Sequence, residues 1–418
     1  MTSASPYRVF LATFGFFTLA AGDVWRYLLS WWGWGAIILV FVTLAVIELV
    51  RSRIDVRRMP ILLFATLALM ALSIAWSAYP GASALGVVAT LCTTVYAVFL
   101  ATCFTWAELA DALARAMRIV LVLSLLFELV VAVFVRGPVL PLFVDYSDLD
   151  KIPQAYYWSR DLLFAGGRIQ GIVGNANILA MAALLSLIAE VARAVAGRGS
   201  RAGSGIWIVL AVAVLALTRS STILVTGVAV VAIVLAAWFA RRGSGARRAA
   251  ITVALPVVLI GAAATAVVFR GPLLALLGRS SDLTNRLDIW QIVAATGAER
   301  PVAGWGWVSY WAPWVEPFDD LVVIKGVTYF QAHNAWLDVF LQLGIFGLVV
   351  VSLFVLSTIA RSWSFALDGP RDSALLPLAL LVAILVQGLA ESRLLIEIGW
   401  ALLVLVSIRT ATNRWERR

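Results

Sequence analysis

Charged side chains are scarce in this sequence of 418 residues: Asp, Glu, Lys and Arg make up 13% of it, while hydrophobic residues make up 62%. Soluble domains are about 45–50% apolar and about 25% charged, so this chain has too few polar side chains to cover a globular surface. Its apolar residues form long runs, whereas a membrane β-barrel requires ~10-residue segments of alternating hydrophobicity. The sequence therefore predicts an all-α fold, in which residues 1–418 form a single integral membrane domain.

Histidine and cysteine are nearly absent. The one histidine is His333, and the two cysteines, Cys92 and Cys103, lie eleven residues apart in one apolar run. A helix would place these cysteines ~16 Å apart, which is too far for a disulfide. So few ligands argue against a structural zinc site, and the sequence has no Walker loop, HExxH motif or nucleophile elbow. We therefore expect neither a metal nor a cofactor.

Twelve apolar stretches divide the chain. They cover residues 8–22, 31–50, 61–78, 82–104, 116–136, 173–192, 205–217, 221–240, 249–269, 334–360, 375–390 and 394–411. The seventh stretch is too short to cross a ~30 Å hydrocarbon core, and it ends in the polar break Thr218-Arg219-Ser220-Ser221. The pattern predicts a polytopic bundle of about 12 transmembrane helices.

Arginines gather in alternate connections between these stretches. They are Arg51, Arg53, Arg57, Arg58, Arg115, Arg118, Arg193, Arg198, Arg201, Arg241, Arg242, Arg247, Arg248, Arg361, Arg371, Arg414, Arg417 and Arg418. Short loops rich in Lys and Arg remain in the cytoplasm. This pattern predicts that both termini are cytoplasmic, and it accounts for the net charge of +9 without a nucleic-acid partner.

The opposite face carries two long extracytoplasmic segments, residues 137–172 and 270–333, and long connections often have a function. In the second segment, Ser281-Asp282 is expected to begin a helix that runs from Leu283 to about Gly297 and ends at Arg300-Pro301. The sequence Gly304-Trp305-Gly306-Trp307 predicts a tight turn. The tryptophans and tyrosines of these segments have a second interpretation, an aromatic belt at the membrane interface.

His333 is a candidate general base, because it lies at the outer start of the tenth stretch. The positive end of the helix dipole there disfavours imidazolium, and a neutral imidazole near neutral pH suits proton abstraction. The competing interpretation, with equal weight, is an interfacial histidine that caps its own helix.

Arginines supply further candidates. Arg219 lies in the polar break, where a charge is costly unless it is paired or lines a wet cavity, so it is a functional candidate. The alternative is a structural arginine that snorkels to the membrane interface or pairs with a carboxylate. Arg286 and Trp290 share a helix face, and a guanidinium matches phosphate oxygens while an indole suits a sugar ring or a lipid. The alternative is a solvated arginine beside an interfacial tryptophan. Further arginines, which indicate an anionic ligand, are Arg168, Arg270, Arg279 and Arg300.

Asn175 and Asn177 begin the sixth stretch on the outer face. An asparagine there can cap the helix or bind hydroxyl groups through its amide, and capping explains one of the two. Glu391 and Arg393 lie between the last two stretches, where we expect them to form an ion pair with each other.

Several of these residues belong to an ordered set of short motifs. The set is Gly174-Asn175-Ala176-Asn177 with Leu179-Ala180, Thr218-Arg219-Ser220, Asn285-Arg286 with Trp290, Pro301 through Gly304-Trp305-Gly306, His333-Asn334 with Leu337, Gly344 and Gly347, and Glu391-Ser392. In order and in common outer placement it resembles the O-antigen ligase and polysaccharide polymerase superfamily of membrane glycosyltransferases. The resemblance covers residues 170–400, and Ala176 stands where members often have proline.

The resemblance implies an inverting, metal-independent glycosyltransferase that moves a glycan from undecaprenyl diphosphate to an acceptor hydroxyl at the outer face of the bacterial cytoplasmic membrane. By resemblance, His333 would deprotonate the acceptor, while Arg219 and Arg286 would bind the diphosphate. The expected substrate-binding residues are Arg168, Asn175, Asn177, Trp290, Trp305 and Asn334. The implied partners are the lipid-linked glycan donor, a glycan or lipid-linked acceptor, and membrane lipids. O-antigen ligase and exopolysaccharide polymerase both remain open.

A membrane transporter of polysaccharide or inorganic carbon is the alternative function, because twelve spans are common among transporters. A non-catalytic scaffold is a third. Transporter sites are expected near the membrane midplane. In this sequence mid-span charges are scarce and the polar motifs gather on one face, which favours the transferase.

Overall fold

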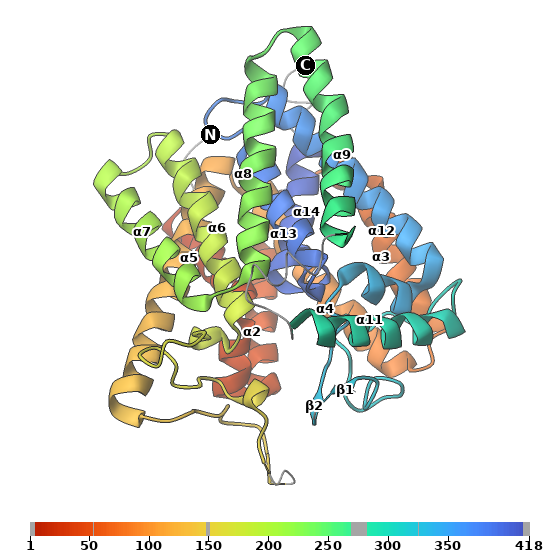
Figure 1. Cartoon of the computed structure of the whole chain (residues 1–418). Helices are drawn as coiled ribbons and strands as arrows, with labels where there is room; N and C mark the ends of the chain where they lie inside the picture. The colour runs from red at the N-terminus through yellow and green to blue at the C-terminus, as the bar shows by residue number, and fades with distance from the viewer. Residues whose placement is uncertain (1–4, 53, 148–150, 269–281, 325, 413–418) are drawn as a thin grey trace.

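The computed structural model describes residues 5–52, 54–147, 151–268, 282–324 and 326–412. Within these ranges the chain forms thirteen α-helices, most of which stand side by side along one axis (Figure 1). The helices on the twelve apolar stretches are α1 (Pro6–Ala20), α2 (Gly22–Ser52), α3 (Ile61–Leu72), α4 (Pro80–Cys103), α5 (Trp106–Val130), α6 (Ala176–Val195), α7 (Arg201–Thr218), α8 (Ser221–Arg242), α9 (Gly245–Val268), α12 (Ala335–Asp368), α13 (Leu376–Gly388) and α14 (Glu397–Thr412).

The remaining elements are short or lie in the long segments. They are α11 (Asp282–Glu299), the strands β1 (Val323–Ile324) and β2 (Val327–Thr328), the π-helix η3 (Val131–Val135), and the 3₁₀ helices η1 (Val56–Arg58), η2 (Ser73–Ala75), η4 (Gln154–Tyr156), η5 (Gly171–Val173) and η6 (Ser392–Leu395). The strands pair antiparallel, with Val323 opposite Thr328 and Ile324 opposite Val327. The mainly helical fold predicted from the sequence is confirmed.

Each predicted apolar stretch is helical, but the helices differ in length. Among the residues that the structure describes, six helices are long and apolar enough to cross a membrane, namely α2, α4, α5 continued by η3, α6, α8 and α12. By contrast, α13 has 13 residues, about 20 Å at 1.5 Å per residue, which is less than a ~30 Å hydrocarbon core. The protein is therefore a multi-pass membrane protein, while the count of twelve spans stays a prediction.

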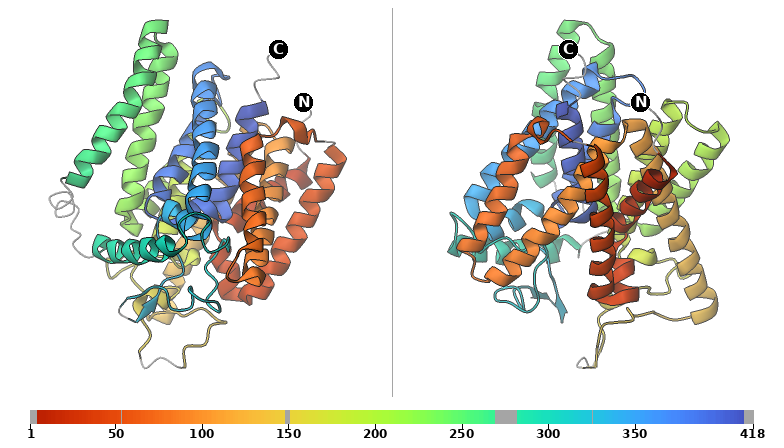
Figure 2. Two further views of the ribbon diagram at one scale, coloured as in Figure 1. Left: turned by 90° about the vertical axis from the view of Figure 1, so that its right-hand side faces the viewer. Right: turned by 180° about the vertical axis from the view of Figure 1, so that it is seen from behind.

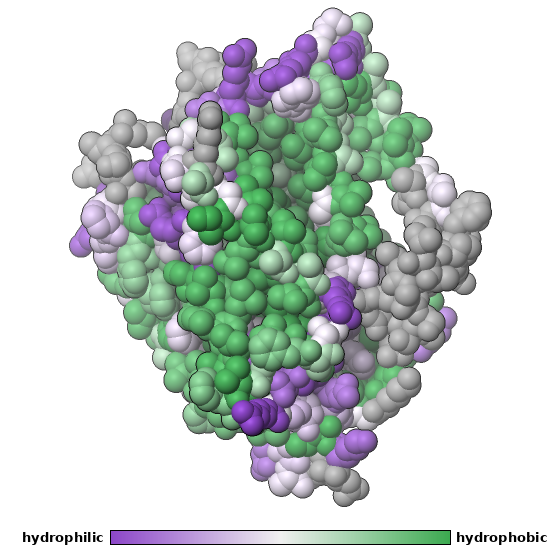
Figure 3. All heavy atoms as spheres, turned by 60° about the vertical axis from the view of Figure 1, so that its left-hand side comes forward, coloured by the Kyte–Doolittle hydropathy of each residue, from purple (hydrophilic) through white to green (hydrophobic). Residues whose placement is uncertain are grey.

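The surface carries the corresponding apolar belt. Figure 3 shows a broad band of hydrophobic residues between two polar ends. Many large aliphatic side chains in this band are exposed, such as Val228 at 64% and Val209 at 68%. Lipid tails cover such side chains without cost, whereas a water-exposed apolar surface of this extent would promote association.

Two short helices occupy the centre of the bundle. α14 packs against α4, α12, α13 and α1, and α13 packs against α8, α12 and α6. The side chains of α14 are buried on every side, among them Trp400, whose Nε1–H donates to Thr94 Oγ1 at 2.8 Å. A helix that is apolar all round is buried in the core of a bundle. The connection between α13 and α14 is consequently held between the surrounding helices.

The polar break after the seventh stretch is confirmed. α7 ends at Thr218, and Arg219 has a left-handed backbone with φ of 46°. Ser220 then caps α8, its hydroxyl accepting from the Ile223 N–H at 3.4 Å. The break therefore reverses the chain between α7 and α8.

The second long segment has its own small core. The predicted loop helix is present as α11, whose Ile289 and Val293 are buried with Trp311, Phe318 and Leu341. Because Leu341 belongs to α12, this core joins α11 to α12. Arg270, Arg279 and the predicted cap Ser281 lie outside the described residues.

The two long segments lie at one end of the molecule, and the start of α1 and the end of α14 lie at the other (Figures 1 and 2). The connection between α8 and α9, which carries Arg241, Arg242 and Arg247, lies at the same end as these chain ends (Figure 1). This arrangement agrees with the predicted separation of the arginine-rich connections from the long segments.

The turn at Gly304 predicts a strong effect of a single methyl group. Gly304 has φ of 69°, and a Cβ there would lie 2.4 Å from the backbone carbon of Gln342 in α12. We expect Gly304→Ala to lower the free energy of unfolding by more than ~1–2 kcal/mol, the cost of a left-handed non-glycine residue alone. Thermal unfolding in detergent measures this effect. Gly81→Ala is the control, because a Cβ at Gly81 meets no atom within 4 Å; equal unfolding temperatures for the two variants would contradict the packing of this turn.

Candidate active site

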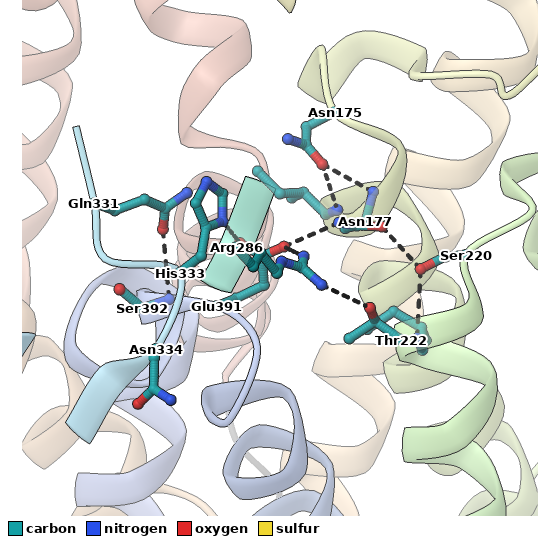
Figure 4. Close-up of polar contacts among 12 residues, drawn as sticks. Asn175, Asn177, Ser220, Thr222, Arg286, Gln331, His333, Asn334, Glu391 and Ser392 are labelled. Carbon is teal, nitrogen blue, oxygen red and sulfur yellow. Dashed lines mark hydrogen bonds and ion pairs between the residues drawn. The ribbon is translucent and has the colours of Figure 1, made fainter. Parts of the chain in front are cut away.

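A buried carboxylate, Glu391, lies between α13 and α14 with 7% of its side chain exposed. Its Oε1 atom accepts hydrogen bonds from Arg286 Nη2 at 2.8 Å and from Asn177 Nδ2 at 2.9 Å. Its Oε2 atom lies 2.8 Å from His333 Nδ1. Residues more than 200 positions apart in the sequence thus meet on one carboxylate (Figure 4).

A second layer of polar contacts surrounds this carboxylate. Asn177 Oδ1 accepts from Arg168 Nη2 at 2.7 Å and from Ser220 Oγ at 2.9 Å. Arg286 Nη1 lies 3.4 Å from Thr222 Oγ1 (Figure 4). We call Asn177, Ser220, Arg286, His333 and Glu391 the Glu391 cluster. It joins the start of α6, the polar break, α11, the start of α12 and the connection between α13 and α14.

His333 is held in place by the residues on either side of it. Asn334 caps α12, its Oδ1 accepting from the backbone N–H groups of Trp336 at 3.0 Å and Leu337 at 3.2 Å. His333 itself has φ of 49°, a left-handed backbone that is uncommon outside glycine. Its ring faces Glu391, with 16% of the side chain exposed. The interpretation of His333 as the cap of its own helix is therefore wrong.

The chain before His333 is fixed by a buried aspartate in the first turn of α12. Asp338 Oδ2 accepts from the Ala332 N–H at 3.2 Å, and its Oδ1 accepts from Trp311 Nε1 at 2.6 Å. Trp311 and Ala332 belong to the small core that also contains Ile289 of α11. The same core thus determines where Arg286 and His333 lie.

The two asparagines at the start of α6 have different roles. Asn175 caps the helix, its Oδ1 accepting from the backbone N–H groups of Asn177 at 2.8 Å and Ile178 at 3.3 Å. Asn177 instead directs its side chain toward Glu391 (Figure 4). A cap accounts for Asn175, and only Asn177 joins the cluster through its side chain.

Arg168 and Arg219 lie beside the cluster. Arg168 Nε donates to the Thr218 carbonyl at 3.1 Å, in addition to its bond to Asn177. Arg219 follows Thr218 and precedes Ser220, so its backbone is bracketed by two residues that contact Arg168 or Asn177. Its guanidinium lies beside Gly166. Arg168 thus contacts the cluster through Asn177, while Arg219 adjoins the cluster through its backbone.

The other three predicted substrate-binding residues have structural contacts. Asn334 is the cap of α12, and its Nδ2 lies 3.3 Å from the Leu389 carbonyl. Trp305 Nε1 donates to the Thr296 carbonyl at 2.9 Å, which ties the turn to α11. Trp290 packs against the small core. The structure does not bring these side chains into the Glu391 cluster, and their substrate contacts stay predictions.

The expected ion pair between Glu391 and Arg393 is wrong. Glu391 pairs with Arg286, while Arg393 pairs with Asp23 at 3.1 Å and with Glu397. Glu391 precedes η6 and Arg393 lies within it, and their side chains contact different partners. The sequence offered one signal for Glu391, a carboxylate between two apolar spans, since such a group requires a partner.

Glu391 is ionised. Burial raises the pKa of its carboxyl, but the charge and hydrogen bond of His333, the guanidinium of Arg286 and the amide of Asn177 outweigh burial and lower the pKa from 4.5 to about 2. An ionised carboxylate only accepts hydrogen bonds, so the proton between the two groups is on His333 Nδ1. In the neutral tautomer that carries this proton on Nδ1, the lone pair is on Nε2.

The cluster is suited to an anion rather than to a metal ion. Arginine, amide and hydroxyl groups dominate it, and these groups donate hydrogen bonds to phosphate oxygens. In the described part of the chain, no group of three or more His, Cys, Asp or Glu side chains could hold a metal ion.

The lowered pKa of Glu391 predicts a pH-dependent stability. Because its pKa is about 2 in the folded protein against 4.5 ordinarily, its stabilising contribution is complete above pH 4.5 and is lost as the pH falls from 4.5 toward 2. In thermal unfolding measurements from pH 6 to pH 3, we expect Glu391→Gln to be less stable at pH 6 and to lose less stability on acidification than the parent protein. Asp55→Asn, at an exposed ion pair with Arg58, should keep the parent profile. Parallel profiles for Glu391→Gln and the parent would refute this assignment.

Two comparisons find known proteins that this sequence resembles. Residues 205–352 match a family model described as O-Antigen ligase, and this segment contains Arg219, Arg286 and His333. The chain is also 25% identical over 118 residues to the exopolysaccharide production protein ExoQ of Rhizobium meliloti (strain 1021). That match spans 27% of this chain and 27% of the relative. The two matches confirm the resemblance of this membrane protein to the O-antigen ligase and polysaccharide polymerase superfamily.

Proposed function

We propose that the protein is a membrane glycosyltransferase that moves a glycan from undecaprenyl diphosphate to an acceptor hydroxyl, with inversion at the anomeric carbon and without a metal. The observation that carries this proposal is the Glu391 carboxylate, which holds an imidazole on one oxygen and a guanidinium on the other. A base and a positively charged group thus face the same region of the outer end of the bundle.

His333 is the proposed general base. Glu391 accepts the Nδ1–H and fixes the ring, so Nε2 can take the proton of the acceptor hydroxyl. The same arrangement orients the histidine of serine hydrolases, where a buried carboxylate also stabilises the imidazolium that forms. The acceptor oxygen, as it loses its proton to His333, attacks the anomeric carbon on the face opposite the diphosphate. The new glycosidic bond forms as the bond to the diphosphate oxygen breaks, which inverts the configuration.

Arg286 is the proposed ligand of the leaving group. A guanidinium has five N–H donors in a planar fork. Arg286 contacts Glu391 through Nη2 and Thr222 through Nη1. Charge develops on the diphosphate oxygens as the bond breaks, and donors already aimed at that position lower the barrier. Arg219 and Arg168 border the same region and are proposed to contribute positive charge. In this mechanism, guanidinium groups supply the charge that a metal ion supplies in other transferases.

The acceptor determines the biological branch. An O-antigen ligase transfers the glycan to a lipid A core, whereas a polymerase transfers it to another glycan chain. The name of the relative refers to exopolysaccharide production, and the second long segment of this chain is rich in tryptophan. We therefore propose an exopolysaccharide or surface-polysaccharide polymerase as the first branch to test.

The proposed location is the bacterial cytoplasmic membrane, with both termini in the cytoplasm and the Glu391 cluster at the outer face. The arginine-rich connections support this orientation, because such loops remain on the cytoplasmic side. The donor would then keep its polyprenyl chain in the bilayer while its diphosphate reaches Arg286 from the outer leaflet.

Sugar transfer in proteoliposomes tests the function. With synthetic undecaprenyl-diphosphate oligosaccharide and EDTA, we expect the parent protein to lengthen or transfer the glycan. His333→Ala and Arg286→Ala should each reduce the rate by at least ~10²-fold, the usual minimum for a general base or a charge-stabilising donor. The product, analysed by mass spectrometry and NMR, also gives the linkage and the branch.

Matched variants separate catalysis from folding. Arg136→Ala removes an exposed arginine just before the first long segment, whose Nε donates to the Val133 carbonyl at 3.0 Å, and it should retain transfer. Glu391→Gln should reduce the rate and alter its pH dependence, because a neutral amide no longer stabilises imidazolium. Folded and inserted His333→Ala with unchanged transfer would contradict the proposal, and a substrate gradient formed without lipid-linked glycan would favour a transporter.

Orientation has a direct test in spheroplasts. Trp314 is exposed in the second long segment, and Arg57 is exposed in η1. A membrane-impermeant maleimide should label Trp314→Cys in intact spheroplasts and Arg57→Cys only after permeabilisation. The reverse pattern would place the Glu391 cluster in the cytoplasm.

A further inference from the structure

The side chain of Gln331 lies beside His333, outside the Glu391 cluster as defined above. Its Oε1 atom accepts a hydrogen bond from the backbone N–H of Ser392 at 3.4 Å. His333 Nδ1 lies 2.8 Å from the carboxylate of the residue before it, Glu391. Gln331 and His333 thus contact two successive residues, so their side chains lie next to each other (Figure 4).

The orientation of this amide follows from its partner. A backbone N–H only donates, so the atom that faces Ser392 is the amide oxygen. The amide nitrogen, Nε2, points the other way, toward the ring of His333 (Figure 4). Gln331 is partly exposed, and in the described part of the chain its Nε2 makes no hydrogen bond and is not buried. An accessible N–H donor therefore lies beside the imidazole.

The imidazole is held on two sides. Glu391 contacts its Nδ1 atom, and the ring of Tyr329 packs edge to face against it, with centroids 5.8 Å apart and an angle of 72° between the planes. His333 Nε2 makes no hydrogen bond to any described residue, and it is not buried either. In the Nδ1–H tautomer this atom carries the lone pair. A fixed lone pair and a fixed N–H donor thus stand side by side.

This pair of groups matches two hydroxyl groups on adjacent carbons of a sugar. The hydroxyl that attacks must direct its own O–H toward His333 Nε2, because the base removes that proton. Its remaining lone pair must attack the anomeric carbon, so a hydrogen bond from Gln331 to the same oxygen would hinder the reaction. The oxygen on the next carbon has free lone pairs and lies within hydrogen-bonding reach of the first, so it is the better acceptor for Gln331 Nε2.

The position of Gln331 also separates it from the leaving group. Gln331 and Arg286 lie on opposite sides of the His333 ring (Figure 4). In a displacement with inversion, the attacking and leaving oxygens are on opposite faces of the anomeric carbon, so the groups that hold them lie apart. A neutral amide is also a weaker partner for a diphosphate than a guanidinium is. Gln331 thus belongs to the acceptor side.

We propose that Gln331 positions the acceptor, and that the acceptor is a sugar with hydroxyl groups on two adjacent carbons. One hydroxyl gives its proton to His333 Nε2 and forms the bond to the anomeric carbon as the bond to the diphosphate oxygen breaks. The other keeps its proton and accepts a hydrogen bond from Gln331 Nε2. This inference rests on the proposed glycosyl transfer and adds the class of acceptor to it. Gln331 holds the substrate and exchanges no proton.

The linkage of the product is the first test. In the proteoliposome assay with undecaprenyl-diphosphate oligosaccharide, NMR identifies the acceptor hydroxyl that has reacted. We expect a secondary hydroxyl with a free hydroxyl on an adjacent carbon. A product linked through the primary hydroxyl of a pyranose, which has no hydroxyl on the adjacent carbon, would overturn this inference and leave the transferase function intact. Absence of transfer by the parent protein would overturn both.

Deoxy acceptors isolate the hydrogen bond from Gln331. Two analogues each lack the hydroxyl on one of the carbons beside the reacting one. With the parent protein, one analogue should have a kcat/KM roughly fivefold below that of the full acceptor, the effect of one net hydrogen bond. Gln331→Met, which has a side chain of similar size without the donor, should use the full acceptor and this analogue equally. A preference in Gln331→Met as large as in the parent would reduce Gln331 to a structural contact of Ser392 and overturn the proposal.

Two controls complete the experiment. Gln154→Met changes an exposed glutamine of η4 and should keep the parent preference for the full acceptor. Because His333 is the one histidine of the chain, protein labelled with ¹⁵N-histidine reports on this ring alone. NMR of Gln331→Met should show the Nδ1–H tautomer, since Glu391 still accepts that proton. Loss of this tautomer would mean that Gln331 acts through the base, which would overturn its assignment to the acceptor.

Discussion

The arrangement of the end of the bundle that carries the two long segments depends on one buried charge. Taking a carboxylate out of water costs several kcal/mol, and the fold is stable only if strong partners replace the water. Glu391 obtains three, namely Asn177 of α6, Arg286 of α11 and His333 just before the cap of α12, and each of them comes from a different part of the sequence. These elements must therefore meet before the carboxylate is satisfied, and the loss of any one partner would leave a charge exposed to an apolar core.

The backbone bends needed for this meeting occur beside the cluster. His333 and Arg219 have left-handed φ values of 49° and 46°, and each is followed by a residue that caps a helix, Asn334 and Ser220. Such conformations cost about 1–3 kcal/mol and persist where the surroundings fix them. In both places the capping residue starts a helix directly after the bend, so the bend is confined to a single residue. The small core that joins α11 to α12 then fixes the position of Arg286 relative to His333.

The sequence predicted the local features of this protein and missed the distant pairings. Long apolar runs, the polar break at Arg219, the cap at Asn175 and the helix after Ser281 all follow from residues that are neighbours in the chain. The partners of Glu391 cannot be predicted in this way, because Asn177 and Glu391 are separated by 214 positions and no pattern of neighbouring residues indicates their contact. The expected pair of Glu391 with Arg393 was wrong for the same reason: the nearest opposite charge in sequence was not the nearest in space. Helix length was also beyond the pattern, since α13 is shorter than its apolar run.

Two ionic clusters lie on the short segment from Glu391 to Glu397, and their composition separates a structural role from a chemical one. Asp23, Arg26, Arg393 and Glu397 form a network of two acids and two arginines. Such a network holds helices together through ion pairs alone. The Glu391 cluster contains an imidazole, which belongs to the one histidine of the chain. An imidazole is the side chain that takes up and releases a proton at physiological pH. If stability were the sole requirement, a second arginine or an amide would serve Glu391 as well, which supports the proposed role of His333 in proton transfer.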